Sequence, residues 1–264
     1  MSATIVKSAI CRTNTFPRPN PTLFFFPGLR SKPIYDPKEF EHITNLLQSN
    51  HEKILKEYLN LQKSGYQSDY IMKADEHQLH SGKWEWQSYM LKGKKQTSFL
   101  ASCPITAHVL DSIPNLMGAT PFSYAFFSRL LPKTVIQPHY GPCNLRIRCH
   151  YPLIIPTSNR LEEDKDKEKE KERERKIVEE GERDRERERE KEKGCGMEIA
   201  GERIEWRERS PLYFDDTYLH TVWNQTESER VVLLFDMWHP DLRESEKEAI
   251  IEMFGYAQNQ GWLK

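Results

Sequence analysis

Short runs of alternating apolar and polar residues fill the chain between residues 122 and 238, with turn signals between the runs. Alternation of this kind predicts β-strands, because successive side chains of a strand point to opposite faces. We expect strands at residues 123–131, 134–137, 145–155, 197–199, 203–206, 212–214, 221–223 and 231–238. Several short strands separated by turns indicate a sandwich or a barrel, and this set is consistent with a jelly roll.

Helical periodicity occurs on both sides of this strand region. Asp36 fits a helix N-cap, with Pro37 at N1 and Glu39 at N3. An apolar stripe at helical spacing follows, formed by Phe40, Ile43, Leu46, Leu47, Ile54, Leu55, Tyr58 and Leu61. We interpret it as one or two helices packed on a flat surface, and we expect further helices at residues 105–113 and 245–256. The predicted fold class is mainly β with flanking helices (α+β), the helices covering the outer face of the strands.

A block of alternating charges interrupts the strand region. Residues 160–193 hold 14 basic and 16 acidic residues among 34, so the block has too few apolar side chains to bury a core face. We interpret it as a solvated surface insertion between two strands. The alternative is an electrostatic arm for RNA or a protein partner. The predicted organisation is an extended arm at residues 1–32 and one domain at residues 33–264, which a disordered or helical insertion at residues 158–195 interrupts.

Charge and cysteine usage limit the class of protein. Lys plus Arg is 39 and Asp plus Glu is 40, so no global field steers the chain onto nucleic acid, and no nucleic-acid partner is expected. No apolar run reaches the length of a membrane-spanning helix, and the first twenty residues lack the apolar core of a secretory signal. The five cysteines form no CxxC pair, which favours reduced thiols. We therefore expect a cytoplasmic protein.

Two histidines lie where a predicted strand meets a turn. His139 lies in the segment Pro-His-Tyr-Gly-Pro, and His220 ends the segment Phe-Asp-Asp-Thr-Tyr-Leu-His. Side chains at strand ends can converge on a cavity. A single histidine is nevertheless more often a core or surface residue than a metal ligand, because imidazole has many other uses. The surrounding residues must therefore decide.

Cationic side chains share one face of the predicted strand at residues 145–155. Arg146, Arg148 and His150 alternate with Leu145, Ile147 and Cys149. Their face is either exposed to solvent or lines the interior of a barrel. A buried arginine needs an anionic partner, so an interior position would imply a carboxylate or phosphate ligand. Arg230, just before the apolar run at residues 231–235, raises the same question, since a guanidinium binds a carboxylate through two parallel hydrogen bonds.

Three segments together resemble the aspartyl/asparaginyl β-hydroxylase domain family. They are HYGPCNLRIRCH at residues 139–150, LYFDDTYLH at residues 212–220 and RVVLLFDMWHPDL at residues 230–242. The segments occur in the order found in the family, and the resemblance covers roughly residues 84–242 around the charged block. It implies a double-stranded β-helix (a jelly roll, cupin-like) that uses Fe(II), 2-oxoglutarate and O2. The implied reaction is hydroxylation of an Asp or Asn side chain in a peptide or protein, with succinate and CO2 as co-products.

The resemblance also assigns roles to individual residues. His139 and His220 match the two iron ligands of the family and would be catalytic. Ser128 matches an oxoglutarate-binding serine, and Arg230 matches the arginine that binds the distal carboxylate.

Three more residues match the cofactor pocket of the family. Arg148 and His150 match two positions that line this pocket. Trp84 matches a tryptophan on the helical side that closes it.

One position departs from the general pattern of non-haem iron oxygenases, which hold iron with two histidines and one carboxylate. The carboxylate slot, two residues after His139, is Gly141. This agrees with the β-hydroxylase branch, in which water can fill the vacancy. Asp215 and Asp216 are expected to form the turn before His220 rather than to supply the third ligand.

Two other functions stay open at this point. The open coordination position could admit a halide, as in oxoglutarate-dependent halogenases. A non-catalytic β-helix module is the second alternative, with residues 160–193 recruiting a protein partner.

Overall fold

The computed structural model describes residues 17–70, 79–156 and 194–263. Most of the predicted charged insertion, and the first sixteen residues of the predicted arm, lie outside the described residues. The last residue of that predicted insertion, Cys195, already belongs to a strand.

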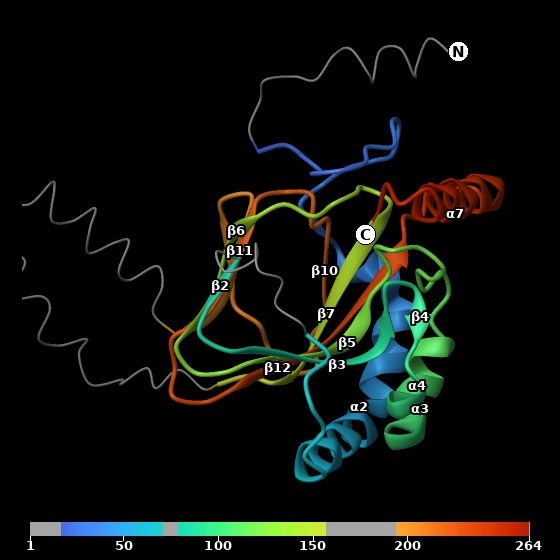
Figure 1. Ribbon diagram of the computed structural model, residues 1–264. Coiled ribbons are helices and arrows are strands. Elements are labelled where there is room, and N and C mark those ends of the chain that lie inside the picture. The colour runs from blue at the N-terminus through green and yellow to red at the C-terminus, as the bar shows by residue number, and fades with distance from the viewer. Residues whose placement is uncertain (1–16, 71–78, 157–193, 264) are drawn as a thin grey trace, which may run out of the picture.

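Two antiparallel sheets form the body of the protein (Figure 1). The larger sheet has the strand order β1 (Ile34–Tyr35), β10 (Leu212–Phe214), β7 (Arg146–Ile154), β12 (Arg230–Trp238), β5 (Ala125–Leu130), β3 (Trp84–Leu91) and β4 (Lys94–Lys95). The smaller sheet has the order β2 (His80–Ser81), β6 (Thr134–His139), β11 (His220–Asn224), β8 (Cys195–Ile199) and β9 (Glu202–Ile204). Buried side chains from both sheets, such as Leu130 and Met197, pack together between them. The fold is the expected double-stranded β-helix.

Every strand predicted from the alternating pattern is present. Four strands, β1, β2, β3 and β4, were not predicted, and of these β3 is the one that bears on the site. Trp84 is the first residue of β3, which pairs with β5, so it lies on a strand of the larger sheet. The pattern of β3 was hidden because Gln87, Ser88, Tyr89 and Met90 are all buried, and a strand covered on both faces does not alternate.

The N-terminal helix begins as the sequence predicts. Asp36 accepts a hydrogen bond from the backbone of Lys38, and the capping box with Glu39 is complete. A 3-10 turn, η1 (Pro37–Phe40), leads into one long helix, α2 (Glu41–Lys63). Two short helices follow later in the chain, α3 (Thr97–Ser102) and α4 (Pro104–Asp111).

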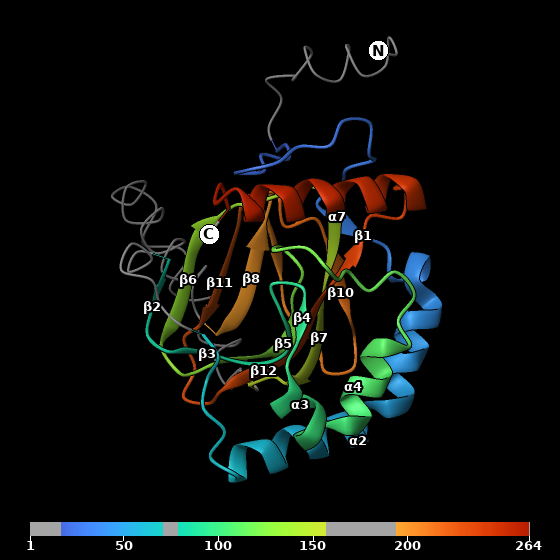
Figure 2. The same cartoon turned by 45° about the vertical axis from the view of Figure 1, so that its right-hand side comes forward.

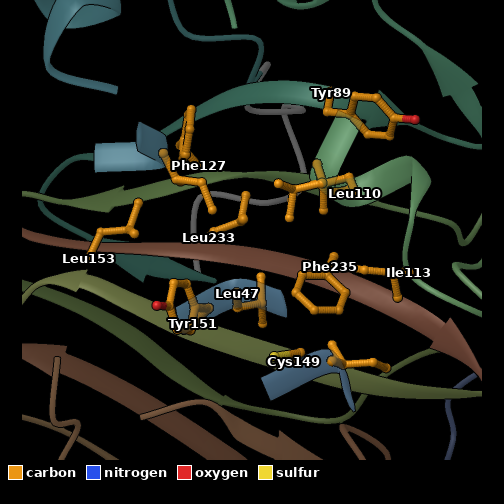
Figure 3. Close-up of a cluster of buried hydrophobic side chains, with 14 of the residues drawn as sticks. Leu47, Tyr89, Leu110, Ile113, Phe127, Cys149, Tyr151, Leu153, Leu233 and Phe235 are labelled. Atoms are coloured by element: carbon orange, nitrogen blue, oxygen red, sulfur yellow. The ribbon is translucent and has the colours of Figure 1, made fainter. Parts of the chain in front are cut away.

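These helices cover the outer face of the larger sheet (Figure 3). Leu47 of α2 and Leu110 of α4 pack against Phe127, Leu233 and other outward-pointing side chains of the sheet. The last helix, α7 (Glu244–Asn259), does not join this layer, contrary to the expectation that the helices cover the outer face. It lies across one end of the two sheets (Figure 2), where Ile250 and Phe254 pack against residues that include Leu145 and Trp238. No helix in the described ranges is long and apolar enough to cross a bilayer.

Strand β12 holds the centre of the larger sheet although it is the last strand in the sequence. It pairs with β5 on one side and with β7 on the other, and all nine of its residues are buried. Its inward-pointing residues, Arg230 and Asp236 among them, therefore lie in the interior between the two sheets. The register brings Arg230 opposite Leu130 and Asp236 opposite Arg148.

Candidate active site

The two candidate iron ligands lie side by side at one end of the smaller sheet. His139 is the last residue of β6 and His220 is the first of β11, and the register of these antiparallel strands pairs them. Their ring centroids are 4.1 Å apart. Two imidazoles this close can each reach the same ion through one ring nitrogen, at a metal–nitrogen bond of roughly 2 Å.

Hydrogen bonds set the tautomer of both rings. Nδ1 of His139 lies 2.8 Å from the carbonyl oxygen of Gln137, and Nδ1 of His220 lies 2.8 Å from that of Tyr218. A carbonyl oxygen can only accept, so each Nδ1 carries the proton and each Nε2 keeps its lone pair. This second bond is also what orients a metal-binding histidine.

Burial keeps the two imidazoles neutral. It lowers the pKa of His139, and it lowers the pKa of His220 to about 3, to which the neighbouring His139 also contributes. Metal ions bind the neutral form of imidazole, so both rings are available as ligands at neutral pH.

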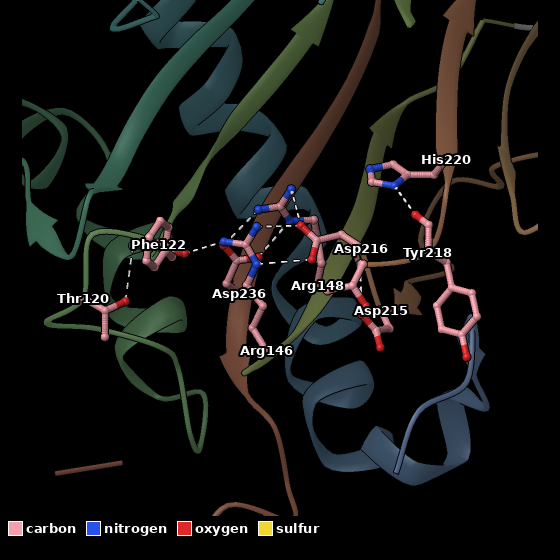
Figure 4. Close-up of polar contacts among 10 residues, drawn as sticks. Thr120, Phe122, Arg146, Arg148, Asp215, Asp216, Tyr218, His220 and Asp236 are labelled. Atoms are coloured by element: carbon pink, nitrogen blue, oxygen red, sulfur yellow. Dashed lines mark hydrogen bonds and ion pairs between the residues drawn. The ribbon is translucent and has the colours of Figure 1, made fainter. Parts of the chain in front are cut away.

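An ion-pair network lies close enough to act on both histidines, and Figure 4 shows it with His220. Arg146 binds Asp216 at 2.5 Å and Asp236 at 3.0 Å, and Arg148 binds the same two carboxylates at 3.1 and 2.8 Å. The face shared by Arg146, Arg148 and His150 therefore points into the interior. The anionic partners of Arg146 and Arg148 are side chains of the protein itself, which corrects the inference that a buried arginine here implies a ligand.

The two aspartates before His220 have different roles. Asp215 accepts bonds from the backbone and the hydroxyl of Thr217, which confirms its role in the turn. Asp216 lies in the same turn, as expected, and its side chain is in addition a member of the network. Burial alone would raise the pKa of Asp216, but Arg146 and Arg148 outweigh burial and hold that pKa well below its usual range.

Gly141 leaves the space that Asp216 occupies. A Cβ atom at position 141 would lie 2.4 Å from the carboxylate carbon and one carboxylate oxygen of Asp216. The slot that holds a carboxylate ligand in other iron oxygenases is therefore filled here by a carboxylate from another loop. The negative charge of Asp216 acts on His139 and His220, whose pKa values it raises against the larger effect of burial.

A second group of polar side chains lies deeper between the sheets. The hydroxyl of Ser128 accepts bonds from Trp84 Nε1 at 2.9 Å and from Arg230 Nη1 at 3.1 Å. With both lone pairs used, its own O–H is left to donate. The structure thus brings Trp84, Ser128 and Arg230 together.

Arg230 is buried without an acidic partner among the described residues. Its side chain is 1% exposed, and its Nε has no hydrogen-bond acceptor there. Burial lowers its pKa to about 10. Nδ1 of the buried His150 also lacks a partner in this part of the chain. A set of buried donors with no acceptor is costly unless an anion fills the space between them, so these residues fit a carboxylate ligand.

Two residues of this region were not predicted, Asp236 of the network and Trp206 on the connection between β9 and β10. The pairing of Asp216 with Arg146 and Arg148 was not predicted either. Asp236 could have been predicted from its position six residues after Arg230, because an even spacing along one strand places both side chains on the same face. The signal for Trp206 was a single aromatic residue in the polar stretch at residues 203–210.

Comparisons with known proteins identify the family. The family model described as aspartyl/asparaginyl beta-hydroxylase matches residues 48–180 and 189–240. This chain therefore belongs to the aspartyl/asparaginyl β-hydroxylase family, as the three sequence segments indicated.

Relatives match over most of this chain but only part of their own length. The chain is 29% identical to aspartate beta-hydroxylase domain-containing protein 2 of Mus musculus over 237 residues, 89% of this chain and 59% of the relative. It is 24% identical to the aspartyl/asparaginyl beta-hydroxylase of Homo sapiens over 87% of this chain and 26% of that protein. Among solved structures, a Pseudomonas putida prolyl-4-hydroxylase covers 72% of this chain and 87% of its own, with 10% identity and a TM-score of 0.38. The fold assignment rests on the sheets of this chain itself.

Proposed function

We propose that this chain is an Fe(II)- and 2-oxoglutarate-dependent dioxygenase that hydroxylates an Asp or Asn side chain of a peptide or protein. The observation that carries the proposal is the pairing of two neutral imidazoles with a buried arginine that has no acidic partner in the described residues. The substrate class comes from the family to which the chain belongs.

His139 and His220 would hold the iron through Nε2, since their Nδ1 atoms are bound to the backbone. Bound iron, with 2-oxoglutarate and O2, supplies the oxidation of a C–H bond. The protein contributes position and exclusion of water. Arg230 and Ser128 would bind the distal carboxylate, His150 would face the same ligand, and Trp84 keeps the Ser128 hydroxyl directed through its indole N–H.

Arg148 borders the iron site but is committed to Asp216 and Asp236. Its part in the site is to keep Asp216 ionised beside the two histidines. A direct contact between Arg148 and the cofactor stays a prediction.

We favour the hydroxylase over the halogenase alternative on one observation. The space beside Gly141 is filled by the ionised carboxylate of Asp216, which would repel a halide. An experiment can distinguish the enzyme from the non-catalytic module, because a non-catalytic module is expected to have no affinity for iron.

The test is binding of Fe(II), and then of 2-oxoglutarate, measured without oxygen by titration calorimetry. Wild type is expected to bind both, and His139→Ala is expected to lose the iron. His108 is an exposed histidine on α4. His108→Ala is therefore the matched control, and it should bind Fe(II) and 2-oxoglutarate as wild type does. Succinate released from 2-oxoglutarate in air, with a pool of Asp- and Asn-containing peptides, then tests turnover. Equal iron affinity of wild type and His139→Ala would disprove the proposal.

A further inference from the structure

The guanidinium of Arg230 is held by few contacts. Within the described residues, its hydrogen bonds come from one nitrogen, Nη1, which donates to the carbonyl and the hydroxyl of Ser128. A planar group fixed at a single corner can pivot about that corner. Some other contact must therefore decide where the free N–H groups of Arg230 point before a ligand arrives.

Trp206 supplies that contact. The central carbon of the Arg230 guanidinium lies 4.5 Å from the centroid of the Trp206 ring, within the range of a cation–π interaction. Because both groups are buried, this attraction is stronger than it would be at an exposed site. The described residues supply no acid to Arg230, so this contact is a main source of stabilisation for its positive charge.

The Trp206 ring is itself held firmly. It is 5% exposed and belongs to the cluster of apolar side chains between the sheets, together with Met197, Ile199 and Phe214. The centroid of the His150 ring, on β7, lies 5.9 Å from the centroid of the Trp206 ring. A rigid aromatic face beneath a guanidinium reduces the ordering that ligand binding must otherwise bring about.

We propose that Trp206 is a positioning residue of the 2-oxoglutarate site: its indole face holds the Arg230 guanidinium in the orientation that binds the distal carboxylate. The inference rests on the proposed function and adds a residue to it. Trp206 acts through Arg230 and needs no contact with the iron.

The test compares two substitutions at position 206. Trp206→Phe keeps an aromatic face and Trp206→Leu removes it. Titration of 2-oxoglutarate into the anaerobic Fe(II)-loaded protein should show a Kd raised about tenfold to thirtyfold in Trp206→Leu and by no more than about threefold in Trp206→Phe. The affinity for Fe(II) alone should stay at the wild-type value in both, because His139 and His220 are untouched.

Trp223 offers a matched control. It is a buried tryptophan of β11 whose ring also faces a guanidinium, that of Arg203, at 5.2 Å. Trp223→Leu should cost the fold a comparable amount of packing and leave the Kd of 2-oxoglutarate unchanged. If Trp206→Leu binds 2-oxoglutarate as wild type does, or weakens it no more than Trp223→Leu, the inference is overturned.

A second readout needs no ligand. Nitrogen-15 NMR of the arginine side chains should show the Arg230 Nε–H signal shifted by the ring current of Trp206, and Trp206→Leu should abolish that shift. If wild type binds no 2-oxoglutarate at all, the proposed function fails, and this signal alone then shows whether Trp206 orders the guanidinium. An Arg230 signal that is the same in wild type and Trp206→Leu overturns the inference in either case.

Discussion

The site has no room for a side chain at position 141, which is occupied by glycine. Its Cα faces the carboxylate of Asp216, which Arg146 and Arg148 hold in place. A methyl group at position 141 would clash with this carboxylate. Rotating the Asp216 side chain would remove the clash only by breaking its buried ion pairs, and the loss of one partner of such a pair is costly.

Gly141→Ala is therefore expected to lower the free energy of unfolding by at least about 1–3 kcal/mol, the usual cost of overpacking. Gly255→Ala is the control, because Gly255 lies within α7 with no atom within 4 Å of the new methyl group. Alanine there should raise stability by roughly 0.5–1 kcal/mol through helix propensity. Denaturation in urea measures both, and a Gly141→Ala protein as stable as wild type would contradict the account.

For single residues, the sequence predicts which ones belong to the candidate site better than it predicts which side chains they contact. His139, His220 and Arg230 stand out through their motifs and strand positions. The partners of Arg146, by contrast, are 70 and 90 positions away, at Asp216 and Asp236. Only the register of β7 against β12 and the course of the loop before β11 bring them together, and neither can be read from alternation of polar and apolar residues.

The start of α4 illustrates how one element stabilises another. Cys103 gives this short helix no side-chain cap. Glu57 of α2 instead accepts bonds from the backbone N–H groups of Ile105 and Thr106 and from the Thr106 hydroxyl, at 2.7–2.8 Å. A carboxylate at a helix N-terminus also interacts favourably with the helix dipole.

Glu57→Ala should lower the free energy of unfolding by about 1–3 kcal/mol, since it leaves buried N–H groups without an acceptor. Lys53→Ala, an exposed position of the same helix, should change it by less than about 0.5 kcal/mol. Hydrogen exchange should show faster exchange at Ile105 and Thr106 in Glu57→Ala only. Unchanged exchange at these amides would refute the capping role of Glu57.

The elements themselves could be predicted where one face of a strand or helix is buried and the other is not. That condition holds for α2, where Leu47 and Tyr58 are buried and Lys53 and Lys56 are exposed. It fails for β3, which is covered on both faces, and for β1, β2 and β4, each only two residues long. Trp206 was placed in a predicted strand at residues 203–206, but β9 ends at Ile204, and alternation alone gave its side chain no role in the site.

The whole molecule should lose stability in mild acid because of its buried histidines. Burial is the leading cause of a lowered pKa at His51, His139, His150, His220 and His239. Below the ordinary histidine pKa of 6.5 the unfolded chain takes up protons that the folded protein does not, so stability falls as the pH falls. Asp215, whose pKa burial raises to about 6, opposes this trend, but it is one group against five.

The histidine contribution can be isolated at His150. For metal-free protein, the free energy of unfolding should fall between pH 7.5 and 5.5, and His150→Leu should reduce that fall by up to about 1.4 kcal/mol, the value of one proton over the unit below 6.5. His42→Leu, at an exposed site on α2, should leave the fall unchanged. Urea denaturation at both pH values is the measurement. An equal fall in wild type and His150→Leu would exclude His150 as a source of the pH dependence.

The position of β12 has a consequence for synthesis of the protein. The strand that lies between β5 and β7 comes after all the other described strands in the sequence, so a nascent chain that ends before Arg230 has a gap in the middle of its larger sheet. Both imidazoles have been made by then, but the layer behind them is incomplete. A truncated chain should therefore be prone to degradation and aggregation, and iron loading should follow release of the full-length polypeptide.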